Sequence, residues 1–245
     1  MKILRFDSLE STNKYCELLD LNQVEEFTVI WALSQTGGVG QQGSHWESET
    51  GKNLTISLVL HPAFLPANSQ FLLTQMLSLA VADYLRQAMP LQAVSIKWPN
   101  DIYVGHRKIC GMLTTTRIAN GHIASAVCGI GLNVNQLQFS PNIPNPTSMA
   151  LCVGHEFELE EVLKALVAAI EKRYTQLQNG ESALVQRDYL SLLLNRGKPA
   201  RYLYQGQKIT ATIQGVDDYG HLLLTDASHR TLVCGIKEIQ FLWEN

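Results

Sequence analysis

Strand-like segments follow one another closely between residues 94 and 134, and the turns between them are very short. Residues 102–104 and 108–118 flank a turn at Gly105-His106, and Asn120-Gly121 leads into residues 123–134. A short turn joins antiparallel neighbours, whereas parallel strands need a crossover of a dozen or more residues. The chain is therefore expected to build a mixed or antiparallel sheet rather than a doubly wound parallel one.

Amphipathic helices alternate with strands along the first 194 residues. Apolar residues at helical spacing predict helices at 68–89, 158–177 and 182–194, and a short helix after the capping residues Ser11-Thr12-Asn13. Further strands are predicted at 3–6, 28–33 and 53–60. Alternation in the segment 53–60 predicts that only one of its faces is buried. The predicted fold class is α+β, a mixed β-sheet with packed helices.

The pattern changes near residue 194, where helical spacing gives way to short strands. Strands are predicted at residues 200–204, 208–216, 222–225 and 231–233. Several short strands in such a small segment are typical of a β-barrel of SH3-like size. We therefore expect two domains, at residues 1–194 and 195–245.

Composition excludes several classes of protein. A net charge of −3 without a basic run argues against a nucleic-acid partner. The five cysteines are scattered, and the seven histidines form no HxxxH pair, so neither a disulfide framework nor a zinc site is predicted. The N-terminus does not resemble a signal peptide, and no apolar run is long enough to cross a bilayer. We expect a cytoplasmic protein with no membrane partner and free thiols.

The densest group of ionisable side chains is Lys97-Trp98-Pro99-Asn100-Asp101, followed by Lys108-Ile109-Cys110-Gly111. Taken alone, the first run reads as a solvated turn. The combination of two ammonium groups, a carboxylate, an amide and a glycine also suits a site that holds an anion near a metal-bound phosphate.

Two glycine-rich segments offer further candidates. Gly38-Val39-Gly40-Gln41-Gln42-Gly43 matches GxGxxG, but a polar loop rather than a helix follows it, so we reject a dinucleotide-binding interpretation. Backbone N–H groups of such a loop can still face an anion. The segment 129–135, Gly-Ile-Gly-Leu-Asn-Val-Asn, fits either a bulged strand end or a close approach to a flat ligand.

The order of these motifs resembles the bacterial biotin protein ligases. Ser11-Thr12-Asn13, the loop 35–46, the KWPND run, the KxxGxL run and the GxGxN run occur in the family's sequence order and span almost the whole chain. The resemblance implies a catalytic domain related to class II aminoacyl-tRNA synthetases, followed by an SH3-like domain. It also implies an enzyme that joins biotin to ATP as biotinyl-5′-adenylate and then transfers biotin to a lysine of a carrier protein.

The resemblance assigns roles to individual residues. Lys108 is the expected catalytic residue, because a carboxylate and a polyphosphate repel each other unless a fixed cation lies between them. Asp101 is the expected ligand of Mg²⁺, which would accompany ATP. The expected biotin-binding residues are Ser11, Thr12, Asn13, Gln35, Gly38, Val39, Gly40, Gln41, Trp46, Lys108, Gly111 and Gly129. The expected ATP-binding residues are Gln41, Gln42, Trp46, Lys97, Asn100, Asp101, Lys108 and Asn133.

The loop 38–46 departs from the family pattern. The family reads GRGRxGRxW, whereas Val39, Gln41 and Ser44 stand at the arginine positions here. A lost contact to an ionised group is worth about 1.5–3 kcal/mol. Three residues of this chain, Lys52, Lys97 and Arg107, are candidates to compensate, as is the surface of the carrier protein. Our hypothesis is an active ligase that holds its adenylate more loosely than an arginine-bearing relative.

Two other interpretations remain open. Lipoate or octanoate ligation uses a related scaffold, but the paired arginines and SGGG loop of those families are missing. A non-catalytic module that binds biotin or a carrier would follow if the altered loop had lost catalysis. Because the first predicted strand starts at Ile3, we expect neither the N-terminal winged helix of some relatives nor DNA binding. A homodimer is a further expectation, although nothing in the sequence specifies the oligomeric state.

Overall fold

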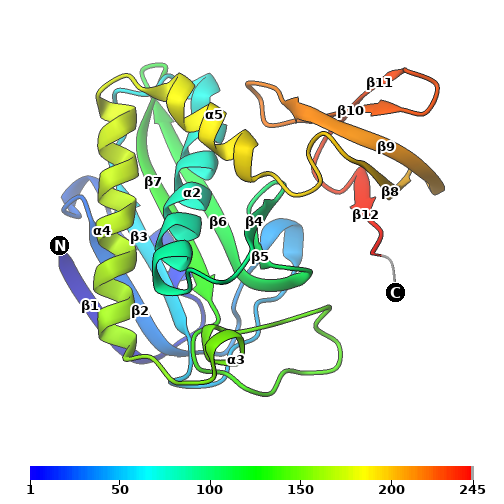
Figure 1. Ribbon diagram of the computed structural model, residues 1–245. Helices are drawn as coiled ribbons and strands as arrows, with labels where there is room; N and C mark the ends of the chain where they lie inside the picture. The colour runs from blue at the N-terminus through cyan, green and yellow to red at the C-terminus, as the bar shows by residue number, and fades with distance from the viewer. Residues whose placement is uncertain (244–245) are drawn as a thin grey trace.

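The structure, a computed structural model, describes residues 1–243 except for the side chain of Gln42. It contains a large sheet packed against helices and a smaller sheet formed by the C-terminal segment (Figure 1). The strands of the large sheet are β1 Lys2–Leu9, β2 Thr28–Gln35, β3 Leu54–Leu60, β4 Val94–Lys97, β5 Asp101–Val104, β6 Arg107–Ala119 and β7 His122–Leu132. Those of the smaller sheet are β8 Pro199–Tyr204, β9 Gln207–Val216, β10 Leu222–Asp226, β11 Thr231–Cys234 and β12 Ile239–Phe241.

Helices occupy the connections between these strands. They are α1 Thr12–Glu17, α2 Gln70–Ala88, α3 Met149–Val153, α4 Leu159–Gln178 and α5 Ser182–Leu192, with short 3-10 segments at η1 Leu21–Gln23, η2 Gln41–Gly43 and η3 Ala67–Ser69. The short α3 and β12 were not predicted. A signal for α3 was available, because Ser148 caps it by accepting a hydrogen bond from the Leu151 amide at 3.2 Å.

The large sheet is mixed, as predicted. Its order is β1-β2-β3-β7-β6-β5-β4, in which β1 pairs with β2 in parallel and all other pairs are antiparallel. The smaller sheet is antiparallel throughout, with the order β11-β10-β9-β8-β12. Its first strand begins at Pro199, while the domain boundary after residue 194 stays a prediction.

Strand β3 is buried on both faces, so the prediction of one exposed face was wrong. Leu54, Ile56, Leu58 and Leu60 face the main core, where α2 and α4 lie side by side across the sheet (Figure 1). On the opposite face, Val59 packs with Cys16 of α1. A strand in the middle of a sheet that helices cover on both faces has no solvent side.

The first turn of α1 also differs from the prediction. Ser11 is the N-cap residue by position, but its side chain makes no capping hydrogen bond. It is nevertheless only 3% exposed and lines a cavity. Leu18, the residue after this helix, is 84% exposed because the helix ends at Glu17.

The smaller sheet is anchored to the large one through the segment after β4. The Nε1 group of Trp98 donates to the carbonyl of Gly220, at 2.9 Å, and the hydroxyl of Tyr189 on α5 donates to the carbonyl of Pro99, also at 2.9 Å. Gly220 lies so close to the Phe71 ring that a Cβ atom there would sit 2.5 Å from it. These contacts place one edge of the C-terminal segment beside the KWPND run.

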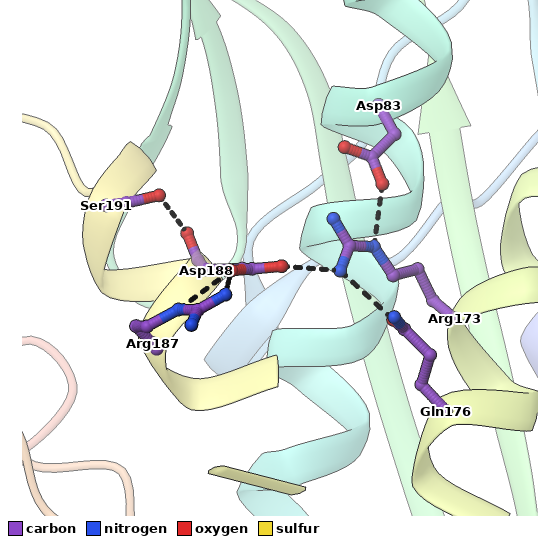
Figure 2. A network of polar contacts seen from close by, with 6 residues as sticks. All are labelled: Asp83, Arg173, Gln176, Arg187, Asp188 and Ser191. Atoms are coloured by element: carbon purple, nitrogen blue, oxygen red, sulfur yellow. Dashed lines mark hydrogen bonds and ion pairs between the residues drawn. The ribbon is translucent and has the colours of Figure 1, made fainter. Parts of the chain in front are cut away.

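The helical layer is joined by a polar network centred on Arg173 of α4 (Figure 2). Arg173 Nε donates to Asp83 of α2 at 2.7 Å, and its Nη1 donates to Asp188 of α5 at 2.8 Å and to Gln176 at 3.0 Å. Helices in residues 1–243 are too short or too polar to span a membrane.

Candidate active site

A cavity of about 650 Å³ lies between the large sheet, the loop after β2 and the C-terminal segment. Most of the predicted site residues line it: Ser11, Thr12, Asn13, Gln35, Val39, Gly40, Gln41, Trp46, Lys97, Asn100, Asp101, Lys108, Gly111 and Gly129. Gly38 and Asn133 are absent from its described lining, and the Gln42 side chain lies outside the described part of the structure. The motifs, although far apart in sequence, therefore meet at one place.

One end of the cavity is polar and uncharged. The Oε1 atom of Gln35 accepts hydrogen bonds from the backbone N–H of Thr12, at 2.7 Å, and from the Thr12 hydroxyl, at 3.1 Å. Because both bonds go to the amide oxygen, the oxygen of Gln35 is oriented by Thr12, and its amide nitrogen, a donor, lies beside Gly38. This end is suited to a neutral ligand group that accepts hydrogen bonds.

Sequence reasoning missed Ser57, which supports this end from below. Ser57 lies on β3, is fully buried, and hydrogen-bonds to Thr12 and Asn13. The predicted alternation of this strand places it on an exposed face instead. A serine within a largely apolar central strand was the available signal, since a buried hydroxyl needs hydrogen-bond partners.

The floor of the cavity is made of paired glycines under the Trp46 ring. Gly111 of β6 is directly opposite Gly131 of β7. A Cβ atom would lie 3.0 Å from the indole at Gly111 and 2.3 Å from it at Gly131, so larger residues would displace the ring. Trp46 is half-buried, and its Nε1 group has no hydrogen-bond partner within residues 1–243. Gly131 was not among the residues that we named for the site.

Two of the predicted glycines serve neighbouring side chains and loops. A Cβ atom at Gly129 would come within 2.4 Å of Asn13, so this glycine makes room for that amide. A Cβ atom at Gly38 would come within 2.4 Å of the Trp46 carbonyl, because residues 38–46 fold back on themselves. The Trp46 amide donates to the Gly38 carbonyl at 3.0 Å, and no crossover helix follows, which confirms that the GxGxxG match is not a dinucleotide fingerprint.

The other end of the cavity is charged. Lys108 Nζ lies 2.6 Å from Asp101 Oδ1, and both side chains are largely buried. Lys108 also lies 5.8 Å from the centre of the Trp46 ring. Lys97 lines the same end, and across the described residues no hydrogen-bond acceptor reaches its Nζ. Two cations thus share one carboxylate.

Burial determines the protonation behaviour of Lys97. Removal from water lowers the pKa of Lys97; Asp101 raises it and the neighbouring Lys108 lowers it. Its Nζ lies 5.7 Å from the Tyr103 ring centre and 5.0 Å from that of Phe241 on β12. The ammonium is therefore held by aromatic faces.

The C-terminal segment contributes to this charged end, which the sequence did not indicate. Trp243 stacks on Tyr103 with ring centres 5.4 Å apart and planes inclined by 23°. Ile236, Lys237, Ile239, Gln240, Phe241 and Trp243 all line the cavity. The sequence carried little signal for this contact, because a pattern of short strands does not indicate which edge of a small sheet will pack against another domain.

The backbone of Lys108 is held by the proline-rich loop. The Lys108 amide donates to the Asn145 carbonyl at 2.7 Å, and the Thr147 amide donates to the Lys108 carbonyl at 2.9 Å. Asn133 holds this loop by donating to the Thr147 carbonyl at 2.9 Å, while its Oδ1 is buried without a partner in the described part of the chain. Asn133 thus lies behind the catalytic candidate, and its ATP-binding role stays a prediction.

Among the three candidates for replacing the loop arginines, one lines the cavity. Lys52 is paired with Glu156 at 2.9 Å on an exposed surface, and Arg107 is exposed outside the lining. Lys97 is the candidate that the fold places at the charged end.

The donor set is poor for a metal bound by protein alone. Within residues 1–243, no group of three His, Cys, Asp or Glu side chains could hold a metal ion. Asp101 is paired with Lys108. Mg²⁺ commonly binds through one or two carboxylates together with substrate phosphates, so this site fits a metal that arrives with its nucleotide.

Comparison with known proteins agrees with this geometry. The model of the biotin/lipoate A/B protein ligase family matches residues 5–133. The bifunctional ligase/repressor BirA of Bacillus subtilis is 30% identical over 228 residues, covering 91% of this chain and 69% of BirA. The biotin–[acetyl-CoA-carboxylase] ligase of Paracoccus denitrificans is 27% identical over 83% of this chain and 86% of its own length.

A solved structure has the same fold. The biotin protein ligase of Aquifex aeolicus, in complex with biotin and ATP, superposes with a TM-score of 0.82 at 23% identity and covers 99% of both chains. The chain belongs to the biotin/lipoate A/B protein ligase family. The resemblance inferred from the motifs is therefore confirmed.

Proposed function

We propose that this protein is a biotin protein ligase, and that the cavity between Thr12 and Lys97 is its active site. The observation that carries the proposal is the pairing, in one cavity, of a neutral donor end at Thr12 and Gln35 with a cationic end at Lys97 and Lys108. Biotin has a neutral cyclic urea at one end and a carboxylate at the other, and ATP adds a polyphosphate beside that carboxylate.

In the first step, a biotin carboxylate oxygen attacks the α-phosphorus of ATP. A carbon–oxygen–phosphorus link forms, the bond between the α-phosphorus and its bridging oxygen breaks, and pyrophosphate leaves with the bond electrons. Lys108 has the charge and position to lie between the two anions, and the nearby Lys97 can bind the phosphates. Mg²⁺ enters with ATP as part of the substrate, and Asp101 is its candidate protein ligand.

In the second step, the neutral amine of a carrier lysine attacks the acyl carbon of the adenylate. The amide bond forms, AMP leaves, and the amine loses a proton. The mixed anhydride is already activated, so alignment supplies most of the catalysis. A carboxyl carrier protein is the acceptor that the names of the related acetyl-CoA-carboxylase ligases imply.

The remaining lining residues fit the same placement. Ser11, Thr12 and Gln35 would bond the urea ring, and Trp46 would cover the ligand above the glycine floor. Asn100 donates to the Met112 carbonyl, so it shapes the turn that bears Asp101. The loop 35–48 would close over the adenylate and exclude water.

Pyrophosphate release tests the proposal directly. The protein, Mg-ATP and biotin should release pyrophosphate, whereas lipoate in place of biotin should not. Mass spectrometry of a biotin carrier domain added to the same mixture should show one biotinyl group on its acceptor lysine. Release with lipoate alone would favour lipoate ligation, and biotin binding without release would favour a non-catalytic module.

A further inference from the structure

Ser57 makes contacts that go beyond filling the core. It lies near the middle of β3 with 0% exposure, beneath the first turn of α1. Its hydroxyl lies 2.8 Å from the Thr12 hydroxyl, and it also hydrogen-bonds to the Asn13 amide oxygen. Two side chains of one short helix therefore meet a single hydroxyl of the sheet.

The direction of these bonds follows from which atoms can donate. The amide oxygen of Asn13 only accepts, so the Ser57 proton goes to it. The Asn13 nitrogen donates to the Leu113 carbonyl at 3.3 Å. The single hydroxyl proton of Thr12 is then shared between Ser57 and Gln35 Oε1, and the backbone N–H of Thr12 orients the Gln35 oxygen by itself, at 2.7 Å.

Asn13 is confined from its other side as well. Gly129, which pairs with Ser57 across β3 and β7, leaves only backbone beneath the Asn13 amide. Asn13 is 6% exposed and Thr12 is 3% exposed, so water has little access to replace a lost partner. An amide whose orientation depends on its bonds can rotate when one partner is removed, which exchanges donor and acceptor.

We infer that Ser57, which does not itself line the cavity, is a positioning residue that sets the donor and acceptor order of Thr12 and Asn13 toward the ligand. This inference rests on the proposed function, because it identifies that order with recognition of the urea ring of biotin. The carbonyl oxygen of that ring accepts hydrogen bonds, whereas a guanidine group at the same place donates them, so the two ligands report the order of donors and acceptors around it.

The test compares Ser57→Ala with Ser78→Ala. Ser78 is also 0% exposed, bonds one carbonyl of its own helix α2 at 2.7 Å, and is remote from the cavity lining, so it controls for loss of a buried hydroxyl. In biotin-dependent pyrophosphate release, Ser57→Ala should raise KM for biotin about tenfold, the equivalent of one lost well-placed bond. KM for ATP should stay within about twofold, and Ser78→Ala should change neither constant.

A second measurement separates positioning from packing. The wild-type protein should prefer biotin over 2-iminobiotin, in which a guanidine replaces the urea, and Ser57→Ala should reduce that preference at least about threefold. An unchanged preference, or equal rises in KM for biotin and ATP, would overturn the inference. Failure of the proposed function would show in the wild-type reaction itself, as no biotin-dependent pyrophosphate, whereas failure of this inference would show only in the variant.

Discussion

The polar clusters around Arg173 and around Lys108 contain similar charged groups but differ in how far positive and negative charges balance. Between the helices, one guanidinium contacts two carboxylates, Asp83 and Asp188, at 2.7 and 2.8 Å (Figure 2). At the cavity, two ammonium groups share the single carboxylate of Asp101. The helical cluster is compensated from within, whereas the cavity cluster keeps an excess of positive charge beside open space.

That difference indicates what each cluster is for. A compensated cluster with planar, directed bonds fixes the relative positions of α2, α4 and α5. An uncompensated one carries a desolvation penalty that only an incoming anion relieves. Variants of the cavity cluster should therefore change catalysis with little loss of stability, and variants of the helical cluster should do the reverse.

Removal of Lys108 should have the largest effect on catalysis. In Lys108→Ala the carboxylate and the α-phosphate would meet without a cation between them, so biotin-dependent pyrophosphate release should fall about 10²–10³-fold. Lys164→Ala is the matched control, because Lys164 pairs with Glu161 on the exposed side of α4. Activity within about threefold of wild type would contradict the catalytic role assigned to Lys108.

Adding a cation to the cavity tests whether more positive charge there slows the release of the adenylate. Val39 is half-buried in the lining, at a position where the family pattern has arginine. In Val39→Arg a charge-assisted bond worth about 1.5–3 kcal/mol should slow adenylate release roughly tenfold to a hundredfold. Val39→Gln, which adds length without charge, should leave the trapped adenylate's off-rate close to wild type. Equal off-rates in wild type and Val39→Arg would refute our hypothesis of loose retention.

Local patterns predicted the elements that build the sheet. Short turns such as Asn120-Gly121 identified the antiparallel run, and α2 and α4 begin and end within two residues of their predicted bounds. The order of motifs also predicted which residues would share a cavity. Each of these predictions depends on neighbours along the chain or on a family resemblance, and the amino-acid sequence alone carries both kinds of information.

Features that depend on packing between distant segments were not predictable in the same way. Ser57 looks like a solvent-facing strand residue until α1 is known to cover it. Phe241 reaches Lys97 because the C-terminal sheet packs its β12 edge against the KWPND run. The resemblance assigned Asn133 to ATP binding, but it did not reveal that the amide nitrogen of Asn133 holds the loop beside Lys108.

Lys97 should lower the stability of the folded protein while it strengthens the binding of ATP. Burial lowers its pKa in the folded state, so the unfolded chain binds the proton more tightly between the folded and unfolded pKa values. Stability of wild type therefore rises with pH through that interval, and below it the full penalty of burying the charge remains. Lys97→Met should be more stable than wild type at pH 7. This difference in the free energy of unfolding should narrow as pH approaches 10.

Urea unfolding at pH 7 and near pH 10 measures the difference in the free energy of unfolding between Lys97→Met and wild type. The KM for ATP measures the loss of function. Without the ammonium at the phosphate end, KM for ATP should rise about tenfold while KM for biotin changes little. Lys164→Met, at an exposed site of α4, provides the control for removing a lysine. A Lys97→Met variant that is less stable than wild type at pH 7 would show that this ammonium contributes to the fold, like the helical cluster.

Replacement of Arg173 should have the smallest effect on catalysis and a clear effect on the free energy of unfolding. Arg173→Met keeps the aliphatic contacts of a side chain that is 12% exposed, but it leaves Asp83 without this cation and Asp188 with only the exposed Arg187. The free energy of unfolding in urea should fall by roughly 1–3 kcal/mol, because hydrogen bonds to charged groups are lost. Arg187→Met is the matched control, since Arg187 is 73% exposed and contacts the same Asp188, and it should lose less than about 1 kcal/mol. Both variants should keep wild-type KM for biotin and ATP, and a change in either constant would mean that the helical cluster reaches the cavity across the sheet.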